Sequence, residues 1–343
     1  MIFATKAVDF RYKILTGTPN KIWNLLLLRF SFYLSKWTGR NLFFGKPFSL
    51  SIEPTTSCNL RCPECPSGLR SFTRPTGMLK EDDFKLMLNQ FKRTVWAMNF
   101  YFQGEPYLNK DFLKMVKLAA ASKIYTITST NAHYLNPETA RETVKSGLHR
   151  LVISIDGSTQ ETYSSYRVGG SLEKVIEGTR NIIKAKNELG SHTPHVIFQF
   201  LVVKPNEHQV EEVRRMASEL GVDELRVKTA QIYDFVNGSP LIPTQDKYSR
   251  YRKSAGGKWE LKNKFENHCW KMWQGCVITW DGKVVPCCFD KDAAHFLGRI
   301  EGANDFRKIW KSPEYQAFRA SVLNNRREID ICKNCSEGTQ VFS

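Results

Sequence analysis

The sequence predicts an α/β protein with a partial (β/α)6 parallel barrel and a small C-terminal α+β domain. From Pro47 to about Ala230, apolar β-like runs alternate with amphipathic helical stretches six times. Helices that join successive strands indicate a parallel sheet with right-handed crossovers. Six units are fewer than the eight of a closed barrel, so we expect the sheet to curl without closing. Farther along the chain, Asp281–Gly282 between apolar runs predicts a hairpin.

The expected elements follow in chain order. The strands are expected at Phe48–Glu53, Met98–Phe102, Tyr125–Ser129, Leu151–Ile155, Val196–Val203 and Glu224–Thr229. The helices are expected at Glu81–Phe91, Phe112–Ala121, Pro137–Ser146, Leu172–Leu189 and Glu207–Leu220, with a short C-terminal one at about Ser312–Leu323. Parallel-sheet enzymes place their chemistry at the carboxyl ends of the strands. Motifs that directly follow these strands are therefore candidate site residues.

Composition divides the chain into four expected segments. Residues 1–46 are amphipathic and basic, residues 47–236 form the barrel, and residues 269–343 form the C-terminal domain. Residues 237–268 are polar and basic, which favours a linker. No apolar stretch of the length of a secretory signal opens the sequence, so we expect a cytoplasmic protein.

The N-terminal segment contains an apolar helix candidate at Ile22–Leu34, interrupted by Asn24, Arg29 and Ser31. This stretch is too short to span a bilayer. Its mixture of aromatic and basic residues is typical of an interfacial helix on an anionic membrane, so residues 20–45 are candidates for peripheral membrane contact. A helix packed on the main domain explains the same pattern equally well.

The chain is strongly basic, because 50 Lys and Arg outnumber 34 Asp and Glu to give a net charge of +16. Such a charge suits an acidic partner: nucleic acid, an anionic membrane, or a phosphorylated or carboxylated substrate. A merely solvated basic surface explains it as well. Nucleic acid is the least favoured partner, because no basic motif interleaved with aromatic residues is found.

The nine cysteines fall into two groups. Cys58, Cys62 and Cys65 follow the first expected strand with the spacing C-x3-C-x2-C, and six others lie between Cys269 and Cys335. Without an export signal, metal binding explains them better than disulfides. Three thiolates can hold three irons of a [4Fe–4S] cube and leave the fourth iron open, whereas a structural zinc site is closed by four ligands.

The triplet resembles the signature of the radical S-adenosylmethionine (SAM) superfamily. The resemblance implies that the open iron is chelated by the methionine moiety of SAM. It also implies that an electron from a flavodoxin- or ferredoxin-like donor leads to reductive cleavage of SAM into a 5′-deoxyadenosyl radical, which abstracts a hydrogen from the substrate. Glu64 is a departure, since many members carry an aromatic residue there, near the adenine.

Three further strand ends resemble SAM-binding motifs of this family. They are Phe102-Gln103-Gly104-Glu105-Pro106 (a GGE-like motif), Ser129-Thr130-Asn131 (a TNG-like strand end) and Ser154-Ile155-Asp156-Gly157 (an SxDG-like segment). The resemblance implies cofactor contacts for Gln103, Gly104, Glu105, Ser129, Asn131, Ser154, Asp156 and Arg167. From the residues alone, Asp156 could equally cap a turn and Arg167 could equally lie on the surface.

The C-terminal cysteines resemble the twitch domain, a short form of the SPASM domain. Cys269, Cys287, Cys332 and Cys335 have spacings x17, x44 and x2, which implies an auxiliary [4Fe–4S] cluster, although four thiolates suit zinc equally well. We interpret Cys276 and Cys288 as buried or spare thiols. The reason for Cys288 is its adjacency to Cys287, since neighbours on a strand point to opposite faces.

The resemblance covers about residues 47–335 and implies that a substrate radical passes an electron to the auxiliary cluster. The cysteine spacing is similar to that of a dehydrogenase acting on an amino-cyclitol, which favours oxidation of a small alcohol, sugar or lipid-linked substrate. A peptide- or protein-modifying maturase is the alternative. A non-catalytic basic metal-binding protein that contacts RNA is a third hypothesis, but it does not explain three thiols in the first group. No catalytic base is identified.

Overall fold

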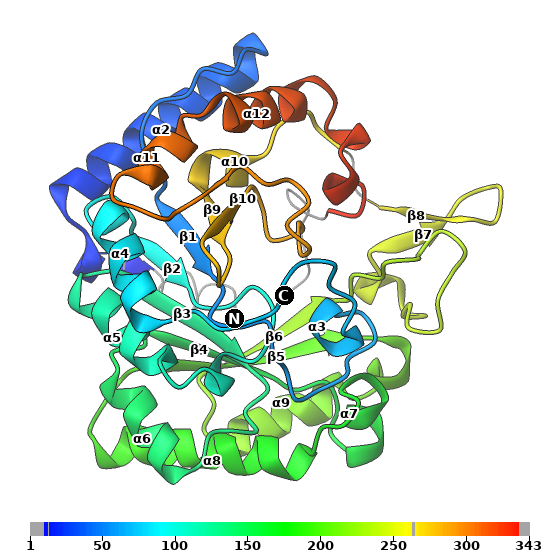
Figure 1. Ribbon diagram of the computed structural model, residues 1–343. Coiled ribbons are helices and arrows are strands. Elements are labelled where there is room, and N and C mark those ends of the chain that lie inside the picture. The colour runs from blue at the N-terminus through cyan, green and yellow to red at the C-terminus, as the bar shows by residue number, and fades with distance from the viewer. Residues whose placement is uncertain (1–9, 13, 263–264, 336–343) are drawn as a thin grey trace.

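The computed structural model describes residues 10–12, 14–262 and 265–335. Its centre is a curled sheet with the strand order β11-β10-β9-β1-β2-β3-β4-β5-β6 (Figure 1). The six parallel strands are β1 Ser49–Ile52, β2 Ala97–Asn99, β3 Tyr125–Thr130, β4 Arg150–Ser154, β5 His195–Val202 and β6 Glu224–Thr229. The expected partial parallel barrel is therefore confirmed.

The outer face of the barrel is covered by helices that connect these strands (Figure 1). The short helix α3 Pro66–Leu69 directly follows the first cysteines, and the covering helices are α4 Glu81–Phe91, α5 Phe112–Ala121, α6 Pro137–Lys145, α7 Gln160–Tyr166, α8 Leu172–Glu188 and α9 Val210–Glu219. Their apolar faces and the outward side chains of the strands form one continuous core. Burial of that apolar surface is the main stabilising contribution to the fold.

Strand β2 differs most from expectation, because it ends at Asn99 and not at Phe102. The following residues leave the sheet as a loop that reaches Gly104, whose φ is +75°. A Cβ at Gly104 would lie 2.3 Å from the carbonyl oxygen of Thr55. Glycine at this position therefore allows the loop after β2 to lie directly against the loop that leads to the first cysteines.

The C-terminal segment adds α10 Trp270–Gln274, β9 Gly275–Ile278, β10 Lys283–Val285, β11 Gly298–Arg299, α11 Asp305–Trp310 and α12 Pro313–Asn325. The expected hairpin is β9–β10. Strand β9 also pairs in parallel with β1, so this segment extends the barrel sheet. A Cβ at Gly275 would lie 1.6 Å from the carbonyl oxygen of Ser49, so this close approach of β9 to β1 depends on glycine.

The stretch 237–268, which we expected as a linker, contains a two-stranded hairpin, β7 Tyr251–Lys253 and β8 Trp259–Leu261. Figure 1 shows this hairpin projecting from the body of the molecule. At the other end of the chain, α2 Pro19–Thr38 packs on α10, and the ring of Phe32 contacts those of Trp270 and Trp273. Among the described residues, no helix is long and apolar enough to cross a membrane.

Candidate active site

The three cysteines of the first group line one cavity at the carboxyl ends of the barrel strands. Cys62 is buried, and Cys58 and Cys65 are half-buried. Burial raises the pKa of the Cys58 thiol to about 11 and also raises the pKa of Cys62. Six of the eight residues expected to contact a cofactor line the same cavity: Gly104, Glu105, Ser129, Asn131, Ser154 and Arg167.

The donor set of this cavity fits an iron–sulfur cluster better than a single ion. In the described part of the chain, no group of three or more His, Cys, Asp or Glu side chains is drawn together closely enough to hold one metal ion. A cube of four irons and four sulfides fills the space between its ligands, so its thiolates stand apart. Three thiols from one loop line this cavity, and they are the donor set that such a cube requires.

Glu105 connects the ends of two neighbouring strands inside this cavity. Its Oε2 accepts a hydrogen bond from the backbone N–H of Asn131 at 2.8 Å, and its Oε1 accepts one from Thr130 Oγ1 at 2.7 Å. Burial raises the pKa of Glu105 to about 7. The carboxylate is thus held in place before any ligand binds, and its remaining lone pairs are available to a cationic group.

Asp156 neither lines the cavity nor caps a turn. One of its oxygens accepts a hydrogen bond from the backbone N–H of Leu201 at 2.7 Å, and the other pairs with Arg167 Nε at 2.5 Å. Arg167 Nη1 in turn lies 3.7 Å from Cys62 Sγ. Asp156 therefore orients Arg167 toward the thiols, and the alternative of a surface arginine does not hold.

Gln103 also lies outside the cavity lining. Its Oε1 is 3.8 Å from Cys65 Sγ, and its amide donates to the carbonyl oxygen of Phe102. The neighbouring Gly104 N–H donates to Ser67 Oγ at 2.9 Å, which ties the loop after β2 to helix α3 behind the cysteines. Both contacts fix the shape of the cysteine loop.

The expected ligands of the second group converge around Arg326, a buried side chain. Its Nη2 donates to Cys335 Sγ at 3.2 Å, and Cys269 and Cys332 lie within electrostatic range of it. Cys269 is also within range of Cys287, so all four thiols belong to one neighbourhood. Burial raises the pKa of Cys332, and the Arg326 cation acts in the opposite direction because it stabilises the thiolate.

The two remaining C-terminal cysteines differ from each other. Cys276 lies buried on β9 beside Tyr315 and Arg319, as expected for a buried thiol. Cys288 is hydrogen-bonded to Cys287, and Lys271 Nζ is 3.9 Å from its sulfur. Our strand argument for Cys288 is wrong, because β10 ends at Val285 and the two cysteines lie in the loop beyond it.

Comparison with known families agrees with this geometry. Residues 52–217 match the model of the radical SAM superfamily, and residues 269–336 match the SPASM iron–sulfur cluster-binding domain. The mycofactocin maturase MftC of Mycobacterium ulcerans is 31% identical over 326 residues, which cover 87% of this chain and 85% of the maturase. The chain belongs to the radical SAM superfamily.

Two further proteins are similar to this radical SAM enzyme, one in sequence and one in structure. The PqqA peptide cyclase of Bradyrhizobium diazoefficiens is 28% identical, covering 85% of this chain and 79% of the cyclase. The structure of Streptococcus suis SuiB bound to the precursor peptide SuiA aligns with a TM-score of 0.61 at 16% identity, covering 90% of this chain and 73% of SuiB. The latter similarity shows the shared fold.

The two family matches define the cofactors of this radical SAM enzyme. It uses SAM and a [4Fe–4S] cluster in the barrel, and its SPASM domain carries auxiliary iron–sulfur binding. The expected iron–sulfur cofactors are thereby confirmed, and the alternatives of zinc and of a non-catalytic RNA-binding protein are not supported.

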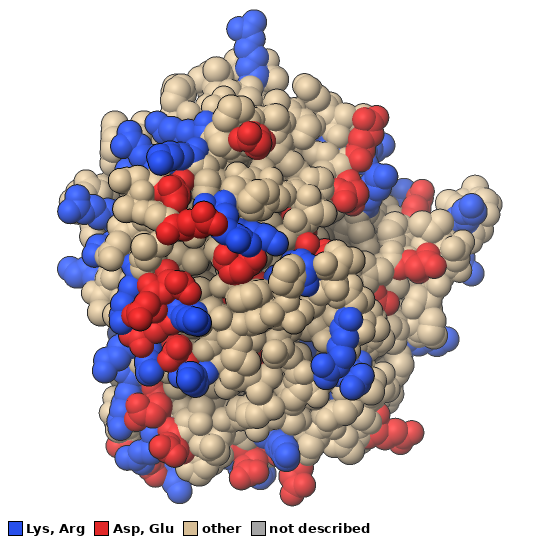
Figure 2. All heavy atoms as spheres, in the orientation of Figure 1, with Lys and Arg blue, Asp and Glu red and all other residues tan. Residues whose placement is uncertain are grey.

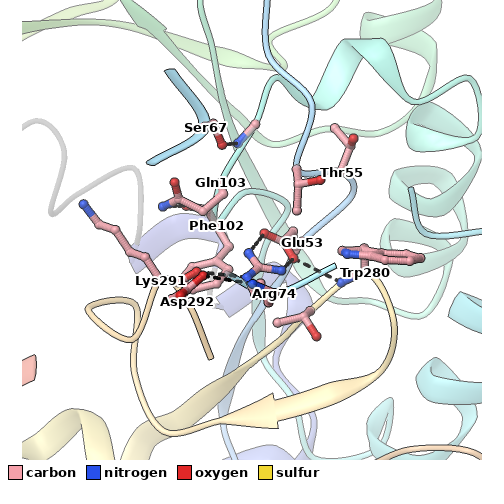
Figure 3. A network of polar contacts seen from close by, with 12 residues as sticks. Glu53, Thr55, Ser67, Arg74, Phe102, Gln103, Trp280, Lys291 and Asp292 are labelled. Atoms are coloured by element: carbon pink, nitrogen blue, oxygen red, sulfur yellow. Dashed lines mark hydrogen bonds and ion pairs between the residues drawn. The ribbon is translucent and has the colours of Figure 1, made fainter. Parts of the chain in front are cut away.

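A buried polar network joins the two cysteine-bearing regions of the radical SAM enzyme. Arg74 forms a bidentate pair with Glu53 at 2.6 and 2.8 Å, and its Nε donates to the carbonyl oxygen of Lys291 at 3.0 Å. Figure 3 shows Arg74 between Glu53, at the end of β1, and the loop that carries Lys291 and Asp292. Asp292 in turn accepts from the backbone N–H of Thr73 at 2.9 Å. The loop containing the second cysteines is thus attached to the loop that follows the first.

Several cavity residues are missed by sequence reasoning. Tyr101 and Ser67 line the cavity, and neither belongs to a recognised motif. The sequence contained a weak indication that Tyr101 faces the cavity, because Tyr101 follows Ala97 and Asn99 at the strand period of two. Ser67 had none, since only the folded cysteine loop brings it to the loop after β2.

Proposed function

We propose that this radical SAM enzyme is a maturase that oxidatively modifies a side chain of a peptide or protein. The observation that carries the proposal is the arrangement of the two thiol groups. Tyr101 lines the cavity of the first group and lies within electrostatic range of Cys288 in the second. A substrate side chain that enters beside Tyr101 thus lies in the neighbourhood of both thiol groups. The names of the cyclase and of the SuiB complex support a peptide as that substrate.

In this proposal the cysteines divide between two clusters. Cys58, Cys62 and Cys65 hold the SAM-binding cluster, and the auxiliary cluster is held by Cys269, Cys287, Cys332 and Cys335. When bound, SAM and the reduced cluster supply a 5′-deoxyadenosyl radical, and the auxiliary cluster supplies an electron acceptor. The high net positive charge suits an acidic flavodoxin- or ferredoxin-like electron donor.

The cavity residues bind and orient SAM. Glu105 and the backbone of Gly104 accept hydrogen bonds from its ammonium group, and Arg167 pairs with its carboxylate. Asp156 positions Arg167, and Gln103 positions the loop of Cys65. Ser129, Asn131 and Ser154 supply hydrogen bonds to the rest of the cofactor.

Dehydrogenation of a small alcohol, sugar or lipid-linked substrate is the second candidate. The observation that favours it is the single set of C-terminal cysteines at the spacing x17, x44 and x2. Both candidates require removal of one hydrogen atom, one electron and one proton from the substrate. They differ only in what the substrate is.

The deciding experiment supplies the anaerobically reconstituted enzyme with SAM, a reductant and peptides encoded beside its gene. We expect 5′-deoxyadenosine together with a peptide that has lost two hydrogens, detected by mass spectrometry. The variant Cys287→Ser should still form 5′-deoxyadenosine but yield little oxidised peptide. Oxidation of a small alcohol with all peptides unchanged would overturn the proposal in favour of the second candidate.

A further inference from the structure

Basic side chains gather on the inner face of the barrel. On β6, Leu225 and Val227 pack into the core between the sheet and the helices. Because side chains alternate along a strand, Arg226 and Lys228 face the barrel interior. The same alternation on β4 places Arg150 on the interior face. All three basic side chains are half-buried.

Two more cations complete this interior cluster. Lys271 of α10 lines a cavity together with Ser51, Asn99 and Cys288. Arg250 donates to the carbonyl oxygen of Thr229 at the end of β6. The cations that lie within electrostatic range of Lys228 are Arg150, Arg226, Arg250 and Lys271. We call these five residues the interior basic cluster.

Among the described residues, Glu224 is an acidic partner of this cluster. Glu224 binds Arg226 at 2.7 Å and is shared with His195. Lys228 has no hydrogen-bond or ion-pair partner among the described residues. Burial and the four neighbouring cations lower its pKa to about 8. Like charges held together in a half-buried space repel one another, and an anion among them would remove that cost.

The cluster is next to the site of chemistry. Tyr101 lines the SAM cavity and lies within electrostatic range of Arg150, Arg226 and Lys271. Lys271 also lies beside Cys288 in the second thiol group. A substrate positioned between the two groups therefore extends toward the interior basic cluster.

We propose that the interior basic cluster binds an anionic oxygen group of the substrate, either a carboxylate or a phosphate. The inference rests on the proposed function and narrows its substrate class. In a peptide this group is an acidic side chain, a terminal carboxylate or a phosphorylated side chain. It anchors the substrate while a neighbouring carbon lies under the SAM cavity.

The test measures anion binding to the anaerobically reconstituted enzyme by calorimetry, without turnover. The probes are glutarate and inorganic phosphate, and the probe that binds more tightly identifies the carboxylate or the phosphate class. In Lys228→Met we expect affinity for that probe to fall about tenfold or more. Thermal stability should rise in this variant, because a repelled cation is removed.

Lys117→Met on the exposed face of α5 is the matched control and should bind like the wild type. Equal affinity in the wild type and Lys228→Met, or no binding of either probe to the wild type, would overturn the inference. Lys228→Gln repeats the test should the methionine variant fail to fold. Since no turnover is measured, the result does not depend on whether a peptide is the true substrate.

An independent observation concerns helix α2, which is oriented with a polar face inward. Its buried residues are Lys21, Asn24, Leu28, Ser31, Phe32 and Ser35. Asn24 donates to the carbonyl oxygen of Lys46 at 2.8 Å, and Ser35 Oγ donates to that of Leu42 at 2.7 Å. The polar side chains of the helix are therefore used to attach it to the rest of the chain.

The opposite face of α2 exposes large apolar side chains to solvent. A stripe at spacings of three and four consists of Trp23, Leu26, Phe30, Tyr33 and Trp37. Their exposed fractions run from 45% for Tyr33 to 79% for Trp37. An ordinary protein surface exposes large apolar residues one at a time, whereas this helix exposes five of them along one face. Such a continuous apolar face marks a contact site.

The basic charge around this stripe indicates which kind of partner the stripe binds. Between Thr16 and Ile52 the chain has no acidic residue, and its exposed basic residues are Arg29, Lys36, Arg40 and Lys46. Along the outer edge that α2 forms in the view of Figure 2, basic and uncharged side chains are seen. A second copy of this chain would bring like charges together. An anionic lipid surface supplies the opposite charge and accepts the aromatic rings at its interface.

We propose that the stripe on α2 docks on an anionic bilayer. The full-length enzyme should co-sediment with vesicles of phosphatidylcholine and phosphatidylglycerol, and weakly with phosphatidylcholine alone. Replacing Trp23, Phe30 and Trp37 by Gln should lower binding about tenfold or more. The control Leu86→Gln/Leu189→Gln, which removes two exposed leucines elsewhere, should bind like the wild type. Undiminished binding of the triple variant would refute the proposal. The proposal would also be refuted if the wild-type enzyme did not bind vesicles but self-associated through α2.

Discussion

At the scale of single residues, the thiols of the first group are expected to be required for SAM cleavage. Cys62 is the buried member and lies against Arg167. Changing it to Ala removes one of three cluster ligands, so we expect 5′-deoxyadenosine formation to fall to background. The assay is chromatography of the anaerobic reaction with SAM and dithionite. Cys276→Ala is the control and should retain activity, because Cys276 is a buried thiol that we assign to neither cluster. Undiminished cofactor cleavage by Cys62→Ala would contradict the assignment.

His149 provides a pH-dependent prediction. It is half-buried between the rings of Tyr12 and Tyr125, and burial lowers its pKa to about 4 from an ordinary value of about 6.5. Between these values the unfolded chain binds a proton that the folded chain does not. Stability is therefore lost as the pH falls below about 6.5, by up to about 2 kcal/mol at pH 5.

Replacing His149 by Gln should flatten this pH dependence. Urea unfolding at pH 7 and pH 5 measures the free energy of unfolding of the wild type and the variant. We expect the loss between these pH values to be smaller by about 1 to 2 kcal/mol in His149→Gln. His192→Gln, at an exposed position, is the matched control. An unchanged pH dependence in His149→Gln would show that this ring is not the titrating group.

At the scale of elements, the Glu53–Arg74 pair joins three of them: the end of β1, the loop after α3 and the loop after β10. Both side chains are almost completely buried, with exposed fractions of 0% and 4%. Arg74→Met leaves the Glu53 carboxylate buried without its partner, so we expect a loss of about 3 kcal/mol or more in the free energy of unfolding. Denaturant titration of the apoprotein measures it.

A double variant separates the pair from general damage. Adding Glu53→Leu to Arg74→Met removes the stranded carboxylate, so the double variant should be more stable than Arg74→Met alone. Exposed Arg141, paired with Glu188 on the surface, is the control, and Arg141→Met should change stability by less than about 1 kcal/mol. If the loss of unfolding free energy in the double variant equalled the sum of the losses in Arg74→Met and Glu53→Leu, the two side chains would act separately.

At the scale of the whole molecule, the two thiol groups predict the metal content. Iron and acid-labile sulfide should both be about eight per chain after anaerobic reconstitution, and about four in the variant with Cys58, Cys62 and Cys65 changed to Ala. The measurement is a colorimetric assay beside metal analysis for zinc. About four irons falling to none, with zinc retained, would remove the auxiliary acceptor from the proposed reaction.

The sequence by itself determined the fold class, the first cysteine motif and most cavity residues. These are local properties: strand and helix periods extend over about ten residues, and the three thiols lie within eight positions of one loop. Glu105, Asn131 and Ser154 were identifiable because parallel strands bring their carboxyl ends to one edge.

Only the tertiary structure decided how distant segments meet. It places β9 beside β1, Asp156 behind Arg167, and Cys288 in a loop with Cys287. It also turns the polar face of α2 inward and directs basic side chains from β4 and β6 into one interior. The physical reason is that these contacts join residues far apart in the chain, and which of them form depends on strand order and packing, which no local pattern encodes.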